Sequence, residues 1–596
     1  SACADTKISS LKVEYEVTPL GIDIEKPRFS WQMTSGKQGQ SQSAYRIIVT
    51  DEAGKEVWNT GTVISDISLN IEFAGNPLKP STRYDWTVFV WNQDDKEFSA
   101  SSWFETGLMD PSVSAWEGAK WIGGGDDDLV FYPDYLPAYN IRYTVQLDEG
   151  SSTNRAGFIY GANDPRLMNK NLNIYNLENG KDESYVEVEL DISKIDTSGN
   201  ALINVYRLGY APTDRKEIPL QTLVVPPSLI HKRNQYDKHT LYLKTMYSKT
   251  DFYVDGEDES NKIGTVIINP IGSSWDYICF PLLCEIGFSV KQDQSARFSD
   301  IEVHNYRMPN NILFSEKLDE VTLNSVFTGK KNLSINENAY QIEGADAGTI
   351  ITANISKKSM PMLRTTFSLD GAKISKARLY ITSRGIYEVY MNGKRVGEDY
   401  FNPGLTQYNQ HHMYQTYDVT DNIRMSENAL GVMLGEGWWS GAITYMGYLW
   451  NLFGDRQSVL AKLVITYADG TEQKIVSDPD TWSYFDNGPV VYSSFFQGEV
   501  YDARKESLTN GWSEVSYSAS GWKKAVEVNQ ENAIAEDKSI ESNRMPAVND
   551  FSNMKLIGQY GQTVKKIKEL TAVSMEEVKP GVYVYDMGQN MVGIPM

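Results

Sequence analysis

The stretch between residues 377 and 441 constrains the fold of this chain most strongly. Residues 379–382 and 387–391 alternate apolar with more polar side chains, and the second run is followed by the pair Asn392-Gly393. Apolar side chains at every second position predict strands with one buried face. Asn-Gly is a preferred pair for a two-residue hairpin turn. No helical spacing longer than one turn occurs here, so the stretch predicts an all-β module.

The same pattern extends over the rest of the chain. Residues 8–108 contain about seven short strand-like runs, a number typical of an immunoglobulin-like or fibronectin-III-like sandwich. Trp31, Trp86 and Trp91 lie in these runs, and we expect them in the core of the sandwich. A length of 596 residues suits several domains. The predicted fold class is all-β, with tandem β-sandwich and jelly-roll domains, one inserted within another.

Composition narrows the function classes. The formal net charge of −22 argues against nucleic-acid binding, because contacts with phosphates require a basic surface. Aromatic residues make up 12 % of the chain, and their faces can stack on sugar rings as well as fill sandwich cores. A neutral glycan is therefore compatible with the charge, and no nucleic-acid partner is expected.

Four short sequence motifs occur in the order found in one enzyme family. They are YMNGKRVG (390–397), NPGLTQY (402–408), LGEGWWSG (434–441) and DMGQN (586–590). Together they resemble the N-terminal β-domains of the family 78 glycoside hydrolases, the bacterial α-L-rhamnosidases. The resemblance implies inverting hydrolysis of terminal α-L-rhamnose from plant or bacterial glycans, with two carboxylates in an (α/α)6 barrel that follows these domains. We therefore expect residues 1–596 to be an accessory portion that is inactive alone, and no catalytic residue is assigned.

The resemblance also suggests domain limits. Residues 1–110 form the first sandwich, and residues 111–129 with 309–526 form the rhamnosidase N-terminal sandwich, here called the host domain. In most family members this domain runs on without a long interruption, so residues 130–308 are interpreted as an inserted, concanavalin-like jelly roll. The resemblance implies that such an insert binds sugar, in some relatives through calcium. Residues 527–596 are interpreted as a linker and the start of a further sandwich that is cut short.

The loop from Gly161 to Asn173 is the densest polar cluster in the insert. Amide and carboxylate oxygens suit sugar hydroxyls or calcium, and a guanidinium can bridge two hydroxyls. The alternative is an Asn-rich loop that satisfies its own backbone. The candidate sugar-binding residues are Asn163, Asp164, Arg166, Asn169 and Asn171, with Tyr160 or Tyr175 nearby and a possible calcium near Asp164. No other cofactor is expected.

The three cysteines carry separate hypotheses. Ser1-Ala2-Cys3 resembles the end of a bacterial lipobox, which predicts a lipid on Cys3 and a lipoprotein of the periplasm or outer-membrane surface; the alternative is a stray thiol. Cys279 and Cys284 can pair or simply pack, and we favour packing. The sequence specifies no oligomeric state.

Two features of the host domain raise the question of a metal site or a catalytic group. The adjacent His411 and His412 point to opposite faces of a strand, so they do not chelate one ion and are expected at the surface. Glu436 has no paired carboxylate nearby in sequence, so we do not assign it as an acid or base. The competing overall function is a stand-alone surface glycan-binding lipoprotein without hydrolase activity.

Overall fold

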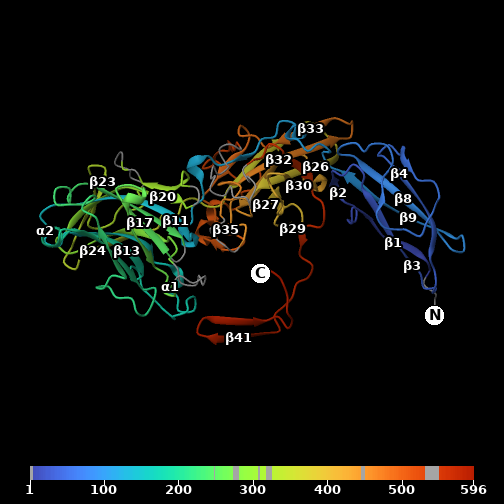
Figure 1. Cartoon of the computed structure of the whole chain (residues 1–596). Coiled ribbons are helices and arrows are strands. Elements are labelled where there is room, and N and C mark those ends of the chain that lie inside the picture. Colours follow the sequence, from blue (N-terminus) through green and yellow to red (C-terminus); the bar gives the residue numbers. More distant parts are fainter. Residues whose placement is uncertain are drawn as a thin grey trace.

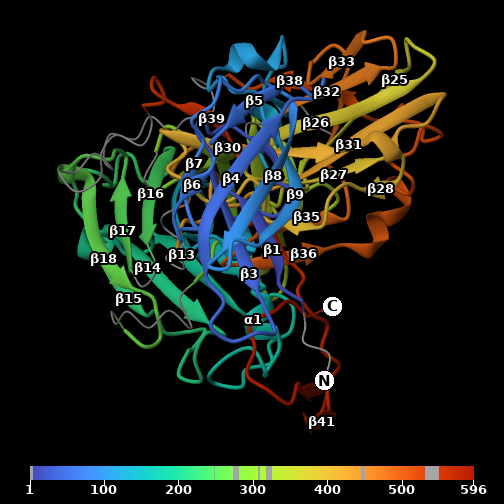
Figure 2. The same cartoon turned by 90° about the vertical axis from the view of Figure 1, so that its right-hand side faces the viewer.

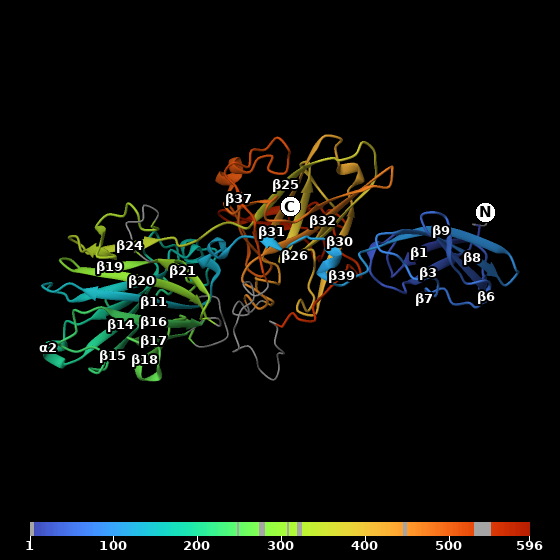
Figure 3. The ribbon, with the colours of Figure 1, turned by 90° about the horizontal axis from the view of Figure 1, so that it is seen from above.

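The computed structural model describes residues 5–246, 249–272, 281–306, 309–316, 318, 325–444, 450–529 and 550–595. Three β-sandwich domains follow one another in a row, with the host domain between the N-terminal domain and the insert (Figures 1 and 3). The few helices of the described residues are single turns, such as α1 (Pro165–Met168) and α2 (Ile195–Ser198). None of these described helices is long and apolar enough to cross a membrane. The predicted all-β fold class is confirmed.

The N-terminal domain packs a three-stranded sheet against a six-stranded sheet. The first contains β1 (Lys7–Val13), β3 (Arg28–Thr34) and β7 (Ile71–Glu72). The second contains β2 (Leu20–Ile22), β9 (Glu97–Thr106), β8 (Arg83–Asn92), β4 (Gln42–Thr50), β5 (Glu56–Asn59) and β6 (Val63–Ile64). Trp31 and Trp86 are buried in its core as expected, and Trp91 is partly buried.

The host domain consists of two sheets whose strands come from both sides of the insert. One contains β38 (Val526–Glu527), β10 (Ile122–Gly123), β32 (Ser458–Tyr467), β26 (Ile374–Arg384), β30 (His411–Asp418), β39 (Lys555–Gly558) and β33 (Glu472–Val476). The other contains β28 (Lys394–Arg395), β27 (Ile386–Met391), β31 (Glu427–Gly435), β25 (Met362–Ser368), β34 (Ser483–Phe485) and β37 (Lys523–Lys524). Because β10 precedes the insert and pairs with β32, the host domain is interrupted as predicted.

The predicted hairpin is present between β27 and β28. Asn392 and Gly393 have φ angles of 50° and 81°, the left-handed values that this two-residue turn requires. Tyr387, Val389 and Met391 point into the host core, while Glu388 and Tyr390 face outward and are partly exposed. The alternation read from the sequence therefore gives the correct buried face.

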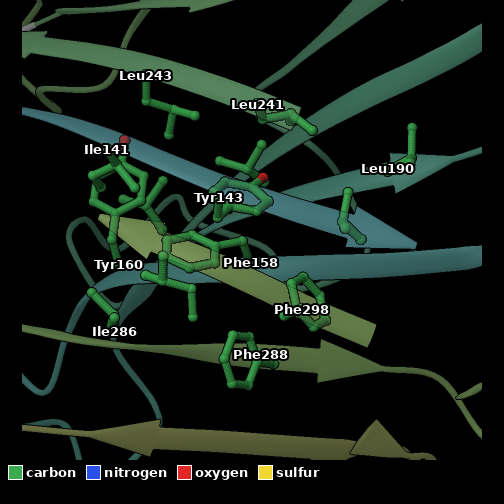
Figure 4. Packing of buried hydrophobic residues seen from close by; sticks show 14 of the residues in the cluster. Ile141, Tyr143, Phe158, Tyr160, Leu190, Leu241, Leu243, Ile286, Phe288 and Phe298 are labelled. Atoms are coloured by element: carbon green, nitrogen blue, oxygen red, sulfur yellow. The ribbon is translucent and has the colours of Figure 1, made fainter. Parts of the chain in front are cut away.

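The insert is a sandwich of two large sheets. The eight-stranded sheet contains β18 (Lys262–Ile267), β17 (Lys249–Val254), β16 (His239–Met246), β11 (Ala138–Leu147), β20 (Ser295–Asn305), β23 (Ala339–Glu343), β22 (Leu333–Asn336) and β21 (Ile312–Glu316). The six-stranded sheet contains β15 (Gln221–Val225), β14 (Ala201–Leu208), β13 (Tyr185–Asp191), β12 (Arg155–Ala162), β19 (Glu285–Val290) and β24 (Thr349–Ala353). Aromatic side chains from both sheets meet in the core, where Tyr143 stacks on Phe158 and Phe288 on Phe298 (Figure 4).

The insert continues beyond the predicted end at residue 308. β23 pairs with β20, and β24 pairs with β19, so the strands of residues 312–353 complete the sheets of the insert and do not return to the host. The ends of the insert meet where Phe131 and Lys357 exchange backbone hydrogen bonds of 2.9 and 2.8 Å. Residues 309–353 are thus part of the insert, a correction that follows from pairing partners distant in sequence.

The C-terminal strands also differ from the expected start of a separate sandwich. β39 runs parallel to β30 within the host sheet, and β40 (Val564–Lys565) pairs with β29 (Asp399–Tyr400). The hairpin of β41 (Ser574–Lys579) and β42 (Val582–Asp586) lies apart from the three sandwiches (Figures 1 and 2). Its apolar side chains, Met575, Val578, Tyr583 and Val584 among them, are exposed.

Candidate sugar-binding loop of the inserted domain

The candidate loop connects β12 to β13 at one end of the six-stranded sheet. Its single helical turn, α1, begins after Asp164, whose Oδ1 accepts a hydrogen bond of 2.9 Å from the backbone amide of Arg166. Pro165 occupies the first position of the turn, where its missing N–H is not needed. The sequence Asp-Pro-Arg thus fixes both the start of the turn and the direction of the Arg166 side chain.

Asp164 and Arg166 form an ion pair. The Arg166 guanidinium donates to both carboxylate oxygens at 2.7–3.1 Å, and the Asp164 side chain is fully buried while that of Arg166 is 28 % exposed. Burial lowers the pKa of Arg166, but the charge and hydrogen bonds of Asp164 outweigh this effect and raise it. The two candidates therefore bind one another, and of the two only the Arg166 side chain retains exposed surface.

The remaining asparagines divide into two groups. Asn173 donates to the backbone carbonyls of Arg166, Asn169 and Leu177 and accepts from the Leu177 amide, so it satisfies the loop's own backbone. Asn169 and Asn171 are exposed, and Asn169 Oδ1 accepts from the Asn171 amide at 3.0 Å. Asn171 is the candidate whose side chain is most open to a ligand.

Asn163 lies at the centre of a polar cluster that the sequence does not reveal. Its Nδ2 donates to Glu285 Oε2 at 2.8 Å, to Asp182 Oδ1 at 3.1 Å and to Thr352 Oγ1 at 3.3 Å. Its Oδ1 accepts from the Asp182 amide at 2.7 Å, and its φ of 57° is left-handed. These partners are 19, 122 and 189 residues away in the chain, so no local pattern points to them.

The cluster does not fit a cation as it stands. Asp182 and Glu285 carry the carboxylate oxygens that calcium prefers, but the amide nitrogen of Asn163 occupies the position between them. Among the described residues, no group of three His, Cys, Asp or Glu side chains is placed to hold a metal ion. Calcium near Asp164 stays a prediction.

Two buried acidic groups lie behind the loop. Burial, followed by the negative charge of Asp164, raises the pKa of Asp134 to about 6. Cys284 is buried with a free thiol whose pKa is raised, chiefly by burial. Cys3 and Cys279 lie outside the described residues.

The aromatic partners expected near the loop are placed differently. Tyr160 is fully buried in the core of the insert, because it faces inward on β12 and its hydroxyl lies 3.5 Å from Thr250 Oγ1 (Figure 4). It therefore presents no face to a ligand, which corrects that expectation. Tyr175 is partly buried in the loop.

The two adjacent histidines of the host domain differ in exposure. His411 is exposed, but His412 is packed between Trp121, Tyr408 and Trp439, and burial lowers its pKa to about 3. The two histidines point to opposite faces of β30 as expected, but only His411 lies at the surface. Both histidines therefore lie outside any metal site among the described residues.

Glu436 is also buried, and it has no second carboxylate beside it among its described contacts. Its Oε2 lies 2.9 Å from the Tyr492 hydroxyl, and its Oε1 accepts from the Trp450 indole at 3.4 Å. Trp438 stacks on Phe495 with ring centroids 4.0 Å apart, and Trp439 is fully buried. The arrangement provides no pair of carboxylates on opposite sides of an open site, so Glu436 is not assigned as a catalytic group.

Comparison with known proteins identifies the N-terminal domain and the host domain. Residues 8–110 match the profile "Rha78A-like, N-terminal immunoglobulin domain", and residues 372–547 match "Alpha-L-rhamnosidase N-terminal domain". An α-L-rhamnosidase of Streptomyces avermitilis is 31 % identical over 98 % of this chain. The chain thus contains N-terminal domains of the family 78 α-L-rhamnosidases.

The family relationship extends to solved structures. The crystal structure of the Streptomyces avermitilis α-L-rhamnosidase complexed with L-rhamnose superposes with a TM-score of 0.55 and 27 % identity over 98 % of this chain and 49 % of that one. A second relative, an α-L-rhamnosidase of Alteromonas sp., is 32 % identical over 43 % of this chain and 25 % of its own length. The chain thus spans about half the length of the Streptomyces relative that it matches almost throughout.

Proposed function

We propose that this chain is the carbohydrate-binding and positioning portion of an α-L-rhamnosidase that acts on rhamnose-containing glycans with inversion. The observation that carries the proposal is the domain order: two domains matched by rhamnosidase profiles enclose a sandwich whose polar loop lies at one end of a sheet.

In this proposal the insert loop binds the sugar. L-rhamnose offers hydroxyl groups and an apolar methyl face, which match amides, a guanidinium and an aromatic ring. Asn169, Asn171 and the exposed part of Arg166 supply these polar groups, while Asp164 holds Arg166 in place. A shallow site with so few buried contacts corresponds to a dissociation constant on the order of 10⁻⁴ to 10⁻³ M.

Calorimetry with L-rhamnose on the full chain tests the binding role. Asn171→Ala removes a side chain with no structural hydrogen bond among the described contacts, so a loss of affinity of at least about fivefold reports ligand contact and not collapse of the loop. Asn336→Ala, an exposed asparagine on β22, is the matched control and leaves the affinity unchanged. Absence of heat at millimolar L-rhamnose, with or without calcium, refutes the loop as a sugar site.

Hydrolysis is assigned to no described residue. An inverting glycosidase needs an acid and a base whose carboxyl groups stand roughly 6.5–9.5 Å apart, to admit a water molecule. We propose that residues 1–596 alone do not hydrolyse an aryl α-L-rhamnoside. Turnover by the purified chain that is abolished by Glu436→Gln would place the chemistry in the host domain instead.

We also propose that Cys3 carries a lipid and tethers the protein to the bacterial membrane, a hypothesis motivated by the Ser1-Ala2-Cys3 sequence. Replacing Cys3 with Ala is expected to move the protein into the soluble periplasmic fraction. Unchanged membrane association after that replacement contradicts the anchor.

A further inference from the structure

A cavity of about 310 Å³ lies on the insert beside the Asn163 cluster. It is bounded by the segment before β13, the segment before β22 and the edge strand β24, and it is lined by Lys181, Asp182, Lys330, Lys331, Asn332 and residues 348–352. This volume is at the lower end of the range in which small molecules bind. The three segments are far apart in sequence, and the two sheets of the sandwich bring them together.

The charge of the cavity opposes that of the whole chain. The protein has 78 acidic and 56 basic residues, yet three lysines and one aspartate line this cavity. None of Lys181, Lys330 and Lys331 forms an ion pair with a described residue, whereas lysines elsewhere, such as Lys462 with Glu117, are paired. Grouped cations without partners attract anions to a concave surface, and the attraction weakens as salt is added.

The one acidic group in the cavity is partly neutralised by hydrogen bonds. Asp182 Oδ1 accepts from Thr352 Oγ1 at 2.6 Å and from Asn163 Nδ2 at 3.1 Å, so it is held toward the protein. Its Oδ2 makes no hydrogen bond with a described residue and can accept one from a ligand hydroxyl. The Asp182 carboxylate therefore adds an acceptor for a hydroxyl, and the three lysines still leave the lining with a net positive charge.

The rest of the lining suits a saccharide. Asn332 is exposed with a left-handed φ of 60°, and its amide offers both a donor and an acceptor. Ile350 on β24 is half-buried and supplies an apolar surface for the face of a sugar ring. Cations, hydroxyl-binding groups and one apolar side chain are thus present in the same small cavity.

We infer that this cavity binds an acidic sugar, with Lys181, Lys330 and Lys331 facing its carboxylate or sulfate group and with Asp182 and Asn332 contacting its hydroxyls. The inference goes beyond the proposed function, because it adds a subsite for a charged residue of the glycan, and it does not depend on L-rhamnose binding at the loop. Since Asp182 contacts Asn163, both sites can hold neighbouring units of one chain.

Titration of the full chain with three related sugars and one salt tests the inference. D-glucuronate and D-glucose 6-sulfate carry the two candidate anions, D-glucose is their neutral counterpart, and sodium sulfate reports binding of a simple ion. We expect at least one acidic sugar to bind with a dissociation constant in the millimolar range or below, at least tenfold more tightly than D-glucose and sodium sulfate. The preferred sugar distinguishes carboxylate from sulfate recognition. Equal binding of D-glucose, or of sodium sulfate, overturns the inference.

Lysine variants test whether the acidic sugar binds in this cavity. The double change Lys330→Gln and Lys331→Gln is expected to weaken the acidic sugar at least fivefold and to reduce the dependence on salt between 50 and 300 mM, while L-rhamnose affinity stays unchanged. Lys249→Gln, an exposed lysine on β17 near the opposite edge of the eight-stranded sheet, is the matched control and has no effect. Unchanged affinity in the double variant overturns the inference, and loss of L-rhamnose binding alone bears only on the loop site.

Discussion

The hydroxyl of Tyr492 lies 2.9 Å from Oε2 of Glu436, and it also lies 2.7 Å from Oε1 of Gln497. A tyrosine hydroxyl has one hydrogen and cannot donate to both acceptors. The Gln497 amide is oriented by its Nε2, which donates to the backbone carbonyl of Tyr135 at 2.9 Å. The contacts are therefore all satisfied when Glu436 is protonated and donates to Tyr492, which in turn donates to Gln497.

This arrangement links the host domain to the start of the insert. Burial raises the pKa of Glu436 to about 8, in agreement with a protonated carboxyl at neutral pH. Tyr492 also stacks against Tyr132, with ring centroids 5.3 Å apart. A neutral Glu436 thus completes a hydrogen-bond chain that ends at the carbonyl of Tyr135, at the boundary between the two domains.

The first prediction is that Glu436→Gln stabilises the host domain at alkaline pH. Between the ordinary pKa of 4.5 and the folded value of about 8, the native state retains a proton that the unfolded state has lost, so wild-type stability falls as pH rises. Glutamine keeps a donor toward Tyr492 without this titration. We expect the variant to gain up to roughly 4 kcal/mol relative to wild type at pH 8 compared with pH 5.

Hydrogen exchange of the β31 and β35 (Val490–Ser494) amides in both proteins measures this gain locally. The comparison of wild type with variant cancels the titration of other groups, such as Asp134. An equal difference in stability at pH 5 and pH 8 contradicts a protonated Glu436.

The second prediction concerns the junction between the N-terminal and host domains. The buried carboxylate of Asp23 accepts from the Tyr414 hydroxyl at 2.7 Å and from the backbone amides of Met109 and Gly558 at 2.9 and 2.6 Å. Asp23→Ala leaves three donors without an acceptor, each worth about 1–3 kcal/mol. We expect exchange of the Met109 and Gly558 amides to accelerate at least tenfold, with Asp66→Ala as an exposed control. Unchanged exchange means that water replaces the carboxylate without loss.

A structural feature could be predicted from the sequence where the residues that determine it are close together in the chain. The turn at Asn392 and Gly393 depends on two adjacent residues, so its hairpin was predictable. The partners of Asn163 come from other strands, and Asp182, Glu285 and Thr352 carry no pattern that joins them. Asn169 and Asn171 were predicted as polar groups of the loop, but the pairing of Asp164 with Arg166 was not.

The same reasoning explains the missed boundary. β22 follows Lys330, Lys331 and Asn332 and has only two half-buried aliphatic side chains, Leu333 and Ile335. A segment so polar gives a weak alternation signal. What fixes it to the insert is pairing with β23, which in turn pairs with β20, and neither partner is visible from the segment itself.

The third prediction separates the roles of Asp164 and Arg166. Asp164→Asn keeps a good helix N-cap and is expected to cost about 1 kcal/mol of stability. Arg166→Met leaves a fully buried carboxylate without its cation, a change that costs about 3–5 kcal/mol when a buried pair is broken. Combining both changes is expected to restore part of that loss. Thermal unfolding of the four proteins measures the coupling, and additive costs contradict an ion pair of structural importance.

The last prediction is that residues 131–357 fold alone whereas residues 130–308 do not. Truncation at 308 removes β21 to β24 and with them several large core side chains, among them the five residues Phe314, Phe327, Tyr340, Ile342 and Ile351. At about 2 kcal/mol for each buried side chain, the loss is about 10 kcal/mol, which matches the whole stability of a typical domain. The truncation also exposes the edges of β19 and β20 and the rings of Phe288 and Phe298.

Circular dichroism and heteronuclear NMR on the two purified proteins decide the matter. Residues 131–357 retain the backbone pair between Phe131 and Lys357 that joins the ends of the insert, so we expect dispersed amide signals and one cooperative thermal transition. For residues 130–308 we expect aggregation or narrow amide dispersion. A cooperative fold of residues 130–308 with the same melting temperature as residues 131–357 would mean that β21 to β24 cover the sandwich without stabilising it.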